Sequence, residues 1–242
     1  MSGEDGRFEI TGLREGVYRV SAGGQFLGSG GGRGRVTRSG LRLEQGAAID
    51  SLELVLPEAG SLLVRVRDAE GLPVTGASIL LRDAEGRALE PLSFNATDGA
   101  GEARISGLAP GEVTVMARTP ESASTESGPV TVREGESELV ELELGPGVVL
   151  LVTMQEREGD REPISAEVTV TDEKGREMTG MLGMSDLNAL YSNAGLSPNE
   201  HRVGPIPPGR YLVEARSGKL SARKSVTIRG HEGERKLTLR LR

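Results

Sequence analysis

The chain has 242 residues and no cysteine, which excludes disulfides, zinc–thiolate sites and thiol nucleophiles. Its 36 acidic residues outnumber its 29 basic ones, and the net charge of −7 opposes the basic excess that is usual in nucleic-acid-binding proteins. Its 35 glycines and 12 prolines fall short of the share typical of disordered chains, so a folded protein is expected.

A short motif occurs three times along the chain, in FEITGLREGVYRV (8–20), ARISGLAPGEVTV (103–115) and RVGPIPPGRYLV (202–213). Each copy has an apolar residue, a glycine three positions later, and an apolar or aromatic residue two positions further on. The motif positions are Leu13, Gly16 and Tyr18, then Leu108, Gly111 and Val113, then Ile206, Gly209 and Tyr211. Because a period of roughly 90 residues is too long for a solenoid, the repeat predicts small, independently folded β domains.

The segments between the motifs alternate apolar and polar residues, as in LLVRVR (62–67) and LTLRL (237–241). Such alternation predicts strands with one buried face. Turn sequences of the form Asp-x-x-Gly separate several of these strands, with glycine where a positive φ is needed. The pattern predicts an all-β chain of consecutive small units, each a sandwich or a barrel.

Unit one is expected at residues 1–57 and begins almost on its motif, so about half of a sandwich is missing. A half sandwich leaves an open edge and an uncovered apolar face. Two explanations stay open here: the sequence is cut from a longer chain, or another chain supplies the missing strands. The segment SLELVL (51–56) is expected to be the closing strand of this unit.

Unit two is expected at residues 58–145 and unit three at 146–242, both complete. The joints between units are short and contain proline and glycine, so a semi-rigid string of modules is predicted. Unit three carries an insertion near 178–193, in which Ser185 could cap a helical turn.

The insertion is rich in methionine, and methionine-rich surfaces adapt to partners. We interpret it either as a lid over one end of the sandwich or as a surface that contacts a partner. The residues of the candidate contact surface are Met178, Met181, Met184, Leu187, Leu190 and Tyr191.

These patterns resemble the carboxypeptidase regulatory-like family, whose members have a transthyretin-like (prealbumin-like, Ig-like) β-sandwich of seven strands. The resemblance implies an all-β chain of tandem seven-strand β-sandwiches, the first of them incomplete. The resemblance rests on Gly71-Leu72-Pro73-Val74, Asp98-Gly99-Ala100-Gly101 and Gly107-Leu108-Ala109-Pro110-Gly111, and on Ile206-Pro207-Pro208-Gly209-Arg210-Tyr211 in unit three. It implies a non-catalytic module attached to a larger protein, such as a bacterial surface protein.

We therefore expect a structural or interaction module with no catalytic residue, no metal and no cofactor. Its two histidines lie 30 positions apart, at 201 and 231, and no serine stands in a G-x-S-x-G motif. The alternative is a carbohydrate-binding accessory module, although six aromatic residues are a poor supply for a sugar platform.

The expected partners are neighbouring domains of a longer chain or another protein, which could supply strands to unit one; no nucleic acid is expected. The longest apolar run, Val148 to Val152, is far shorter than the roughly 20 residues of a membrane span. The resemblance implies an extracytoplasmic location, at the cell surface, in the periplasm or secreted, although no signal peptide is visible in the first residues.

Overall fold

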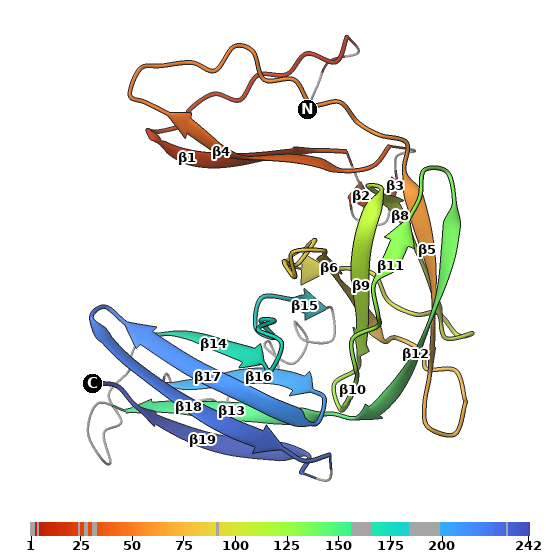
Figure 1. Ribbon diagram of the computed structural model, residues 1–242, viewed down its shortest axis with the longest axis vertical. Coiled ribbons are helices and arrows are strands. Elements are labelled where there is room, and N and C mark those ends of the chain that lie inside the picture. The colour runs from red at the N-terminus through yellow and green to blue at the C-terminus, as the bar shows by residue number, and fades with distance from the viewer. Residues whose placement is uncertain are drawn as a thin grey trace.

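The computed structural model describes residues 3, 5–23, 25–26, 29–30, 33–90, 92–155, 166–183, 199–230 and 232–242. Strands are the only regular secondary structure in these ranges, which confirms the all-β prediction (Figure 1). Unit one contains β1 (Gly16–Ala22), β2 (Gln25–Phe26), β3 (Ser29–Gly30) and β4 (Val36–Leu43). Unit two contains β5 (Gly60–Arg67), β6 (Ser78–Asp83), β7 (Leu92–Ser93), β8 (Glu102–Leu108), β9 (Gly111–Arg118), β10 (Ser122–Ser124), β11 (Val130–Val132) and β12 (Ser137–Pro146). Unit three contains β13 (Val148–Gln155), β14 (Glu167–Asp172), β15 (Leu182–Gly183), β16 (Glu200–Ile206), β17 (Gly209–Ser217), β18 (Leu220–Ile228) and β19 (Glu234–Arg240).

Units two and three share most of their strand pairs, although in unit two β10 also pairs with both β9 and β12 and so joins the two layers. In each, the opening strand lies at the centre of one sheet, in the orders β8-β5-β12 and β16-β13-β19. The opening strand pairs in parallel with the closing strand and antiparallel with the strand that leads into the repeated motif. The facing sheet has β9 between β6 and β11 in unit two, and β17 between β14 and β18 in unit three.

Alternation along the strands fills the space between the two sheets. On β5, Leu62, Val64 and Val66 have no exposed surface, while the residues between them are partly exposed. Because successive side chains of a strand point to opposite faces, this pattern places one face of β5 in the core. β13 also places alternate residues, Leu150, Val152 and Met154, in the core of unit three.

The predicted Asp-x-x-Gly turns have the expected geometry. In the turn after β6, the Asp83 carboxylate accepts hydrogen bonds from the backbone N–H groups of Glu85 and Arg87, at 3.1 and 2.8 Å. Gly86 has a φ of 77°, a region that side chains with a Cβ rarely adopt. Asp68, Asp98 and Asp172 accept the same pair of backbone bonds in their own turns.

Unit one differs from the other two, because only β1 and β4 form a long hairpin in it. The predicted closing segment 51–56 is not a strand, and neither is the segment 8–13. In units two and three the corresponding segments are strands that flank the opening strand. Among the described residues of unit one there is no opening strand, so neither segment has a partner for its backbone groups.

The repeated motif holds its turn closed through a tyrosine. The Tyr211 hydroxyl donates to the Pro207 carbonyl oxygen at 2.7 Å, and Tyr18 makes the corresponding bond to Arg14 at 2.6 Å. Tyr211 is 5% exposed, whereas Tyr18 is only partly buried. A buried hydrogen bond therefore closes the turn in unit three, and a more solvent-accessible one closes it in unit one.

Replacing Tyr211 by Phe should lower the free energy of unfolding by about 1 kcal/mol, because the buried Pro207 carbonyl loses its donor. Tyr18→Phe is the matched control and should cost less, since water can replace the lost bond. Urea titrations followed by circular dichroism measure both changes. Equal losses in the two variants would contradict the role given to burial.

Candidate functional site

The buried charged side chains of the described residues lie at the contact between units two and three. The side chains of Arg82 on β6 and Glu126 before β11 are 3% and 6% exposed. Arg82 Nε lies 3.1 Å from Glu126 Oε1, and the other carboxylate oxygen pairs with Arg176 of unit three. Glu126 therefore joins one arginine from each unit.

The network continues into unit three through Arg176, whose Nε donates to Asp172 Oδ2 at 2.7 Å. Thr114 adds a hydroxyl donor to Glu126 Oε1 at 2.7 Å. Two arginines are thus balanced by two carboxylates, with hydrogen bonds that offset their removal from water. Such an arrangement fixes the register of one unit on the other more than it adds stability.

Electrostatics at this contact follow from burial. Desolvation lowers the pKa of the Arg82 guanidinium, and the carboxylates of Asp172 and Glu177 oppose that shift. Desolvation and then the charge of Arg82 lower the pKa of Arg176. Burial raises the pKa of the neighbouring Tyr211 hydroxyl, so this tyrosine is neutral. Burial therefore disfavours the charged form of both guanidinium groups.

Two further arginine contacts cross the same boundary. Arg82 donates to the carbonyl oxygen of Glu177, and Arg118, on β9, donates to the carbonyl oxygen of Met181. Both carbonyls belong to the first part of the unit-three insertion. Arg118 is 2% exposed, so its charge is held at the contact by backbone oxygen atoms of the other unit.

Apolar residues seal the contact around these charges. Leu80 of β6 and Met116 of β9 belong to the hydrophobic cluster that also contains Met178, Met181 and the core of unit three. The neighbouring Ile79 and Leu81 belong to the separate core of unit two. The β6–β9 sheet is therefore covered on both faces, by its own core and by unit three (Figure 1).

The sequence contained only a partial signal for this arrangement, in the continuous apolar run Ile79-Leu80-Leu81. β5 has a run of the same length, Leu62-Leu63-Val64, so the run alone does not distinguish a strand buried on both faces. Continuous apolar strands are typical of sheets buried on both faces. Arg82 interrupts the apolar run at the one position that meets the carboxylate of Glu126.

The predicted contact residues of the insertion fall into two groups. Met178 and Met181 are 6% and 1% exposed and pack between units two and three, so they contact the neighbouring unit of the same chain. Just beyond them, β15 pairs in parallel with β7 of unit two. Met184, Leu187, Leu190, Tyr191 and the predicted helical turn lie outside the described residues.

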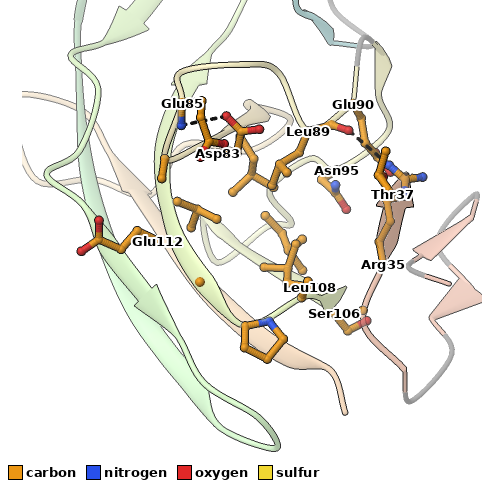
Figure 2. Close-up of a pocket in the computed structure, with 18 of the residues that line it drawn as sticks. Arg35, Thr37, Asp83, Glu85, Leu89, Glu90, Asn95, Ser106, Leu108 and Glu112 are labelled. Atoms are coloured by element: carbon orange, nitrogen blue, oxygen red, sulfur yellow. Dashed lines mark hydrogen bonds and ion pairs between the residues drawn. The ribbon is translucent and has the colours of Figure 1, made fainter. Parts of the chain in front are cut away.

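A groove of about 690 Å³ lies where unit one meets unit two (Figure 2). Its walls come from β6, β8 and the start of β9, with Leu89 and Leu108 among the apolar side chains. Unit one closes one side with Arg35, which donates to the Leu89 carbonyl oxygen at 3.2 Å and lies 3.4 Å from Glu90. The groove is apolar inside and carries carboxylates at its rim.

Three of the carboxylates that line the groove are held in ion pairs. The Asp83 and Glu85 carboxylates pair with Arg87, and Glu90 pairs with Arg35. Within the described residues, no three histidine or carboxylate side chains are grouped so that they could hold a metal ion. His201 lies on β16, where burial lowers its pKa, and residue 231 is outside the described ranges. The geometry therefore suits contact and binding.

The motif residues lie at the entrances of β1, β9 and β17, where each chain segment turns from one sheet to the next. Gly111 has a φ of 146°, which favours glycine at this turn. Val113 and Tyr211 are each 5% exposed, and Ile206 is fully buried. The motif positions in units two and three serve packing and turn formation.

The family model of the carboxypeptidase regulatory-like domain matches residues 61–145. Unit two is therefore a domain of this type, and the predicted resemblance is confirmed over this segment. No curated protein matches the chain. No helix that is long and apolar enough to span a membrane occurs in the described part of the chain.

Several solved structures are similar to this chain at low sequence identity and low TM-score. The TIE protein of Bacillus anthracis has 16% identity and a TM-score of 0.31, with 76% of this chain and 34% of that chain covered. BcpA, the major pilin subunit of Bacillus cereus, has 9% identity and a TM-score of 0.30, with 76% and 99% covered. GBS52, the minor pilin of Streptococcus agalactiae, has 14% identity and a TM-score of 0.30, with 75% and 95% covered. The chain thus spans about a third of the length of the TIE protein, and TM-scores this low support no conclusion about function.

Replacing Glu126 by Gln should destabilise the contact between units two and three by about 3–5 kcal/mol, because two arginines lose their shared carboxylate. The matched control is Glu102→Gln, which breaks the partly exposed Arg65–Glu102 pair and should cost less than about 1 kcal/mol. Chemical denaturation of both variants measures the difference. A loss for Glu126→Gln no larger than the control would show that the network does not hold the units together.

Proposed function

We propose that the chain is a non-catalytic structural and interaction module in which consecutive β-sandwich units are docked into a stiff array. The unit boundaries near residues 57/58 and 145/146 are part of this proposal. The single observation that carries it is the hydrophobic cluster that continues from Leu80 and Met116 of unit two into unit three. Independently moving domains would not share buried side chains.

Three features support docking over flexible linkage. The joint Gly145-Pro146-Gly147 leaves no spare chain, because β12 ends at Pro146 and β13 begins at Val148. A Cβ at Gly147 would lie 2.7 Å from Pro205 and 3.0 Å from the backbone of Ala123, so the two units approach closely there. The charge network adds directional contacts on the other side of the joint.

Unit one is the part of the module whose sheet is incomplete among the described residues. Its contact with unit two is tight around Gly34, where a Cβ would lie 2.9 Å from the Cα atom of Ala109. Beyond this contact, its hairpin carries apolar residues that are exposed. We propose that strands from a partner complete this unit, so that the module can be joined to other protein parts.

The resemblance to carboxypeptidase regulatory-like modules supports an extracytoplasmic location as part of the same proposal. It also supports a role beside other domains rather than a reaction of its own. A hydrolytic activity that copurified with the chain and was abolished by a single substitution would overturn the non-catalytic assignment.

Small-angle X-ray scattering tests the docking directly. The unmodified chain should scatter as one rigid arrangement of units two and three. Met181→Asp buries an unpaired charge at a side chain that is 1% exposed, and should broaden the distance distribution while both units stay folded. Met181→Leu, which conserves volume, should leave the distribution unchanged.

Leu139→Asp is the control for added charge, because Leu139 is 50% exposed on the outside of β12. It should scatter as the unmodified chain does. If the unmodified chain already scatters as independently tumbling units, the proposed function is wrong.

A further inference from the structure

The described residues of unit one include no opening strand at the centre of a sheet. In unit two, β5 pairs with β8 on one side and with β12 on the other. In unit three, β13 pairs in the same way with β16 and β19. Counting from the repeated glycines Gly16, Gly111 and Gly209, segment 8–13 of unit one occupies the position of β8 and β16.

Loss of that central strand explains both irregular segments of unit one at once. No backbone hydrogen bond joins residues 8–13 or 51–56 to any other described residue. Each segment would flank the missing strand, as β8 and β12 flank β5. A single added strand would therefore supply partners for two rows of unpaired N–H and C=O groups.

Apolar side chains of unit one are exposed at positions where units two and three bury the equivalent side chains. Ile10 is 52% exposed, whereas Ile105 and Val203, six residues before their own motif glycines, are 2% and 7% exposed. Leu13 is 43% exposed, whereas Ile206 is fully buried. The same sequence positions are thus core residues where the opening strand is present and surface residues where it is absent.

The closing segment gives the same result. Leu52, Leu54 and Leu56 alternate with exposed residues but are only partly buried, and Val55 is 71% exposed. In unit two, Val140, Leu142 and Leu144 have the same alternation and are 5–7% exposed. Six of the nine large apolar side chains that the described structure exposes lie in unit one: Phe8, Ile10, Leu13, Val17, Ile49 and Val55.

The two complete units define the chemistry of the missing strand. Both opening strands contain the sequence Leu-Leu-Val, as Leu62-Leu63-Val64 and Leu150-Leu151-Val152. The first leucine lies opposite the residue that corresponds to Ile10, as in the pairs Leu62–Ile105 and Leu150–Val203. The valine lies opposite the position of Phe8, as Val64 lies opposite Ala103.

Resting on the proposed function, we infer that unit one accepts one β-strand with this alternating Leu-x-Val-x-apolar pattern from a polypeptide segment outside residues 1–242. The strand runs antiparallel to residues 8–13 and parallel to residues 51–56, between the two. A second copy of the chain has no spare strand of this kind, because β5 and β13 are paired on both sides in their own units. Backbone hydrogen bonds to the two flanking segments provide the affinity for the added strand, and its alternating apolar side chains fix the register.

Hydrogen–deuterium exchange of the full chain with a synthetic peptide tests this inference. The probe is GSLLVRVR, the sequence of β5, and the control peptide carries Leu62→Asp and Val64→Asp, which remove the inward apolar groups. At saturating probe, exchange in both 8–13 and 51–56 should slow by about tenfold or more, with no change from the control peptide. Protection of neither segment, or of only one, would overturn a shared central position.

Disulfide cross-linking tests the register of the added strand. Because the chain has no native cysteine, only the introduced cysteines can react. A probe with Leu62→Cys should form a disulfide with the Ile10→Cys chain and not with Glu9→Cys, whose side chain points to the opposite face. Equal cross-linking of both variants would overturn the register. Light scattering that shows a dimer, with both segments protected before any peptide is added, would overturn the inference in favour of a second copy.

The scattering test of units two and three separates this inference from the proposed function. A rigid two-unit array with no peptide binding would leave the docking intact and remove only the strand acceptor. A flexible array would refute the docking whatever the peptide does.

Discussion

The opening strand of each unit is the element on which the remaining structure depends. It lies at the centre of its sheet, is hydrogen-bonded on both edges, and in β5 buries every second side chain completely. Because the closing strand pairs with it in parallel, residues about 75 positions apart, such as Ser61 and Ser137, are brought together. In units two and three this strand is present, and the other strands and turns pack around a core. Among the described residues of unit one it is absent. There the flanking segments stay unpaired although their sequences alternate apolar and polar residues.

The contact between units two and three also depends on covering apolar surface, here the second face of the β6–β9 sheet. A sheet has two faces, and covering the second face of β6 and β9 removes more apolar surface from water. Leu80, Met116, Met178 and Met181 accomplish this, and the Arg82–Glu126–Arg176 network fixes their alignment. Since a buried charge pair requires good geometry, the network tolerates few relative positions of the two units. The proposed stiffness of the joint rests on this packing together with the short linker.

Much of this could be predicted from sequence because it depends on local chemistry. Alternation predicted the strands, and Asp-x-x-Gly predicted the hairpin turns after β6 and β14. The repeated motif predicted where strands would turn between sheets. Sequence analysis did not find the role of Arg82 and Glu126, which lie 44 positions apart and pair through the fold. It also expected residues 51–56 to form a strand, since their pattern is right; the missing partner was not visible in that pattern.

The sequence by itself determined the strand periodicity, the turn positions and the register of the repeats, because each depends on neighbours along the chain. Only the tertiary structure decided which faces are covered. It placed Met178 and Met181 against a neighbouring unit, although their sequence is equally suited to a free surface. It left Ile10 exposed while burying Ile105, although the two occupy the same place in the repeat. Whether a side chain is buried depends on the strand that packs beside its own strand. That neighbouring strand comes from another part of the sequence, so the local pattern does not show whether it is present.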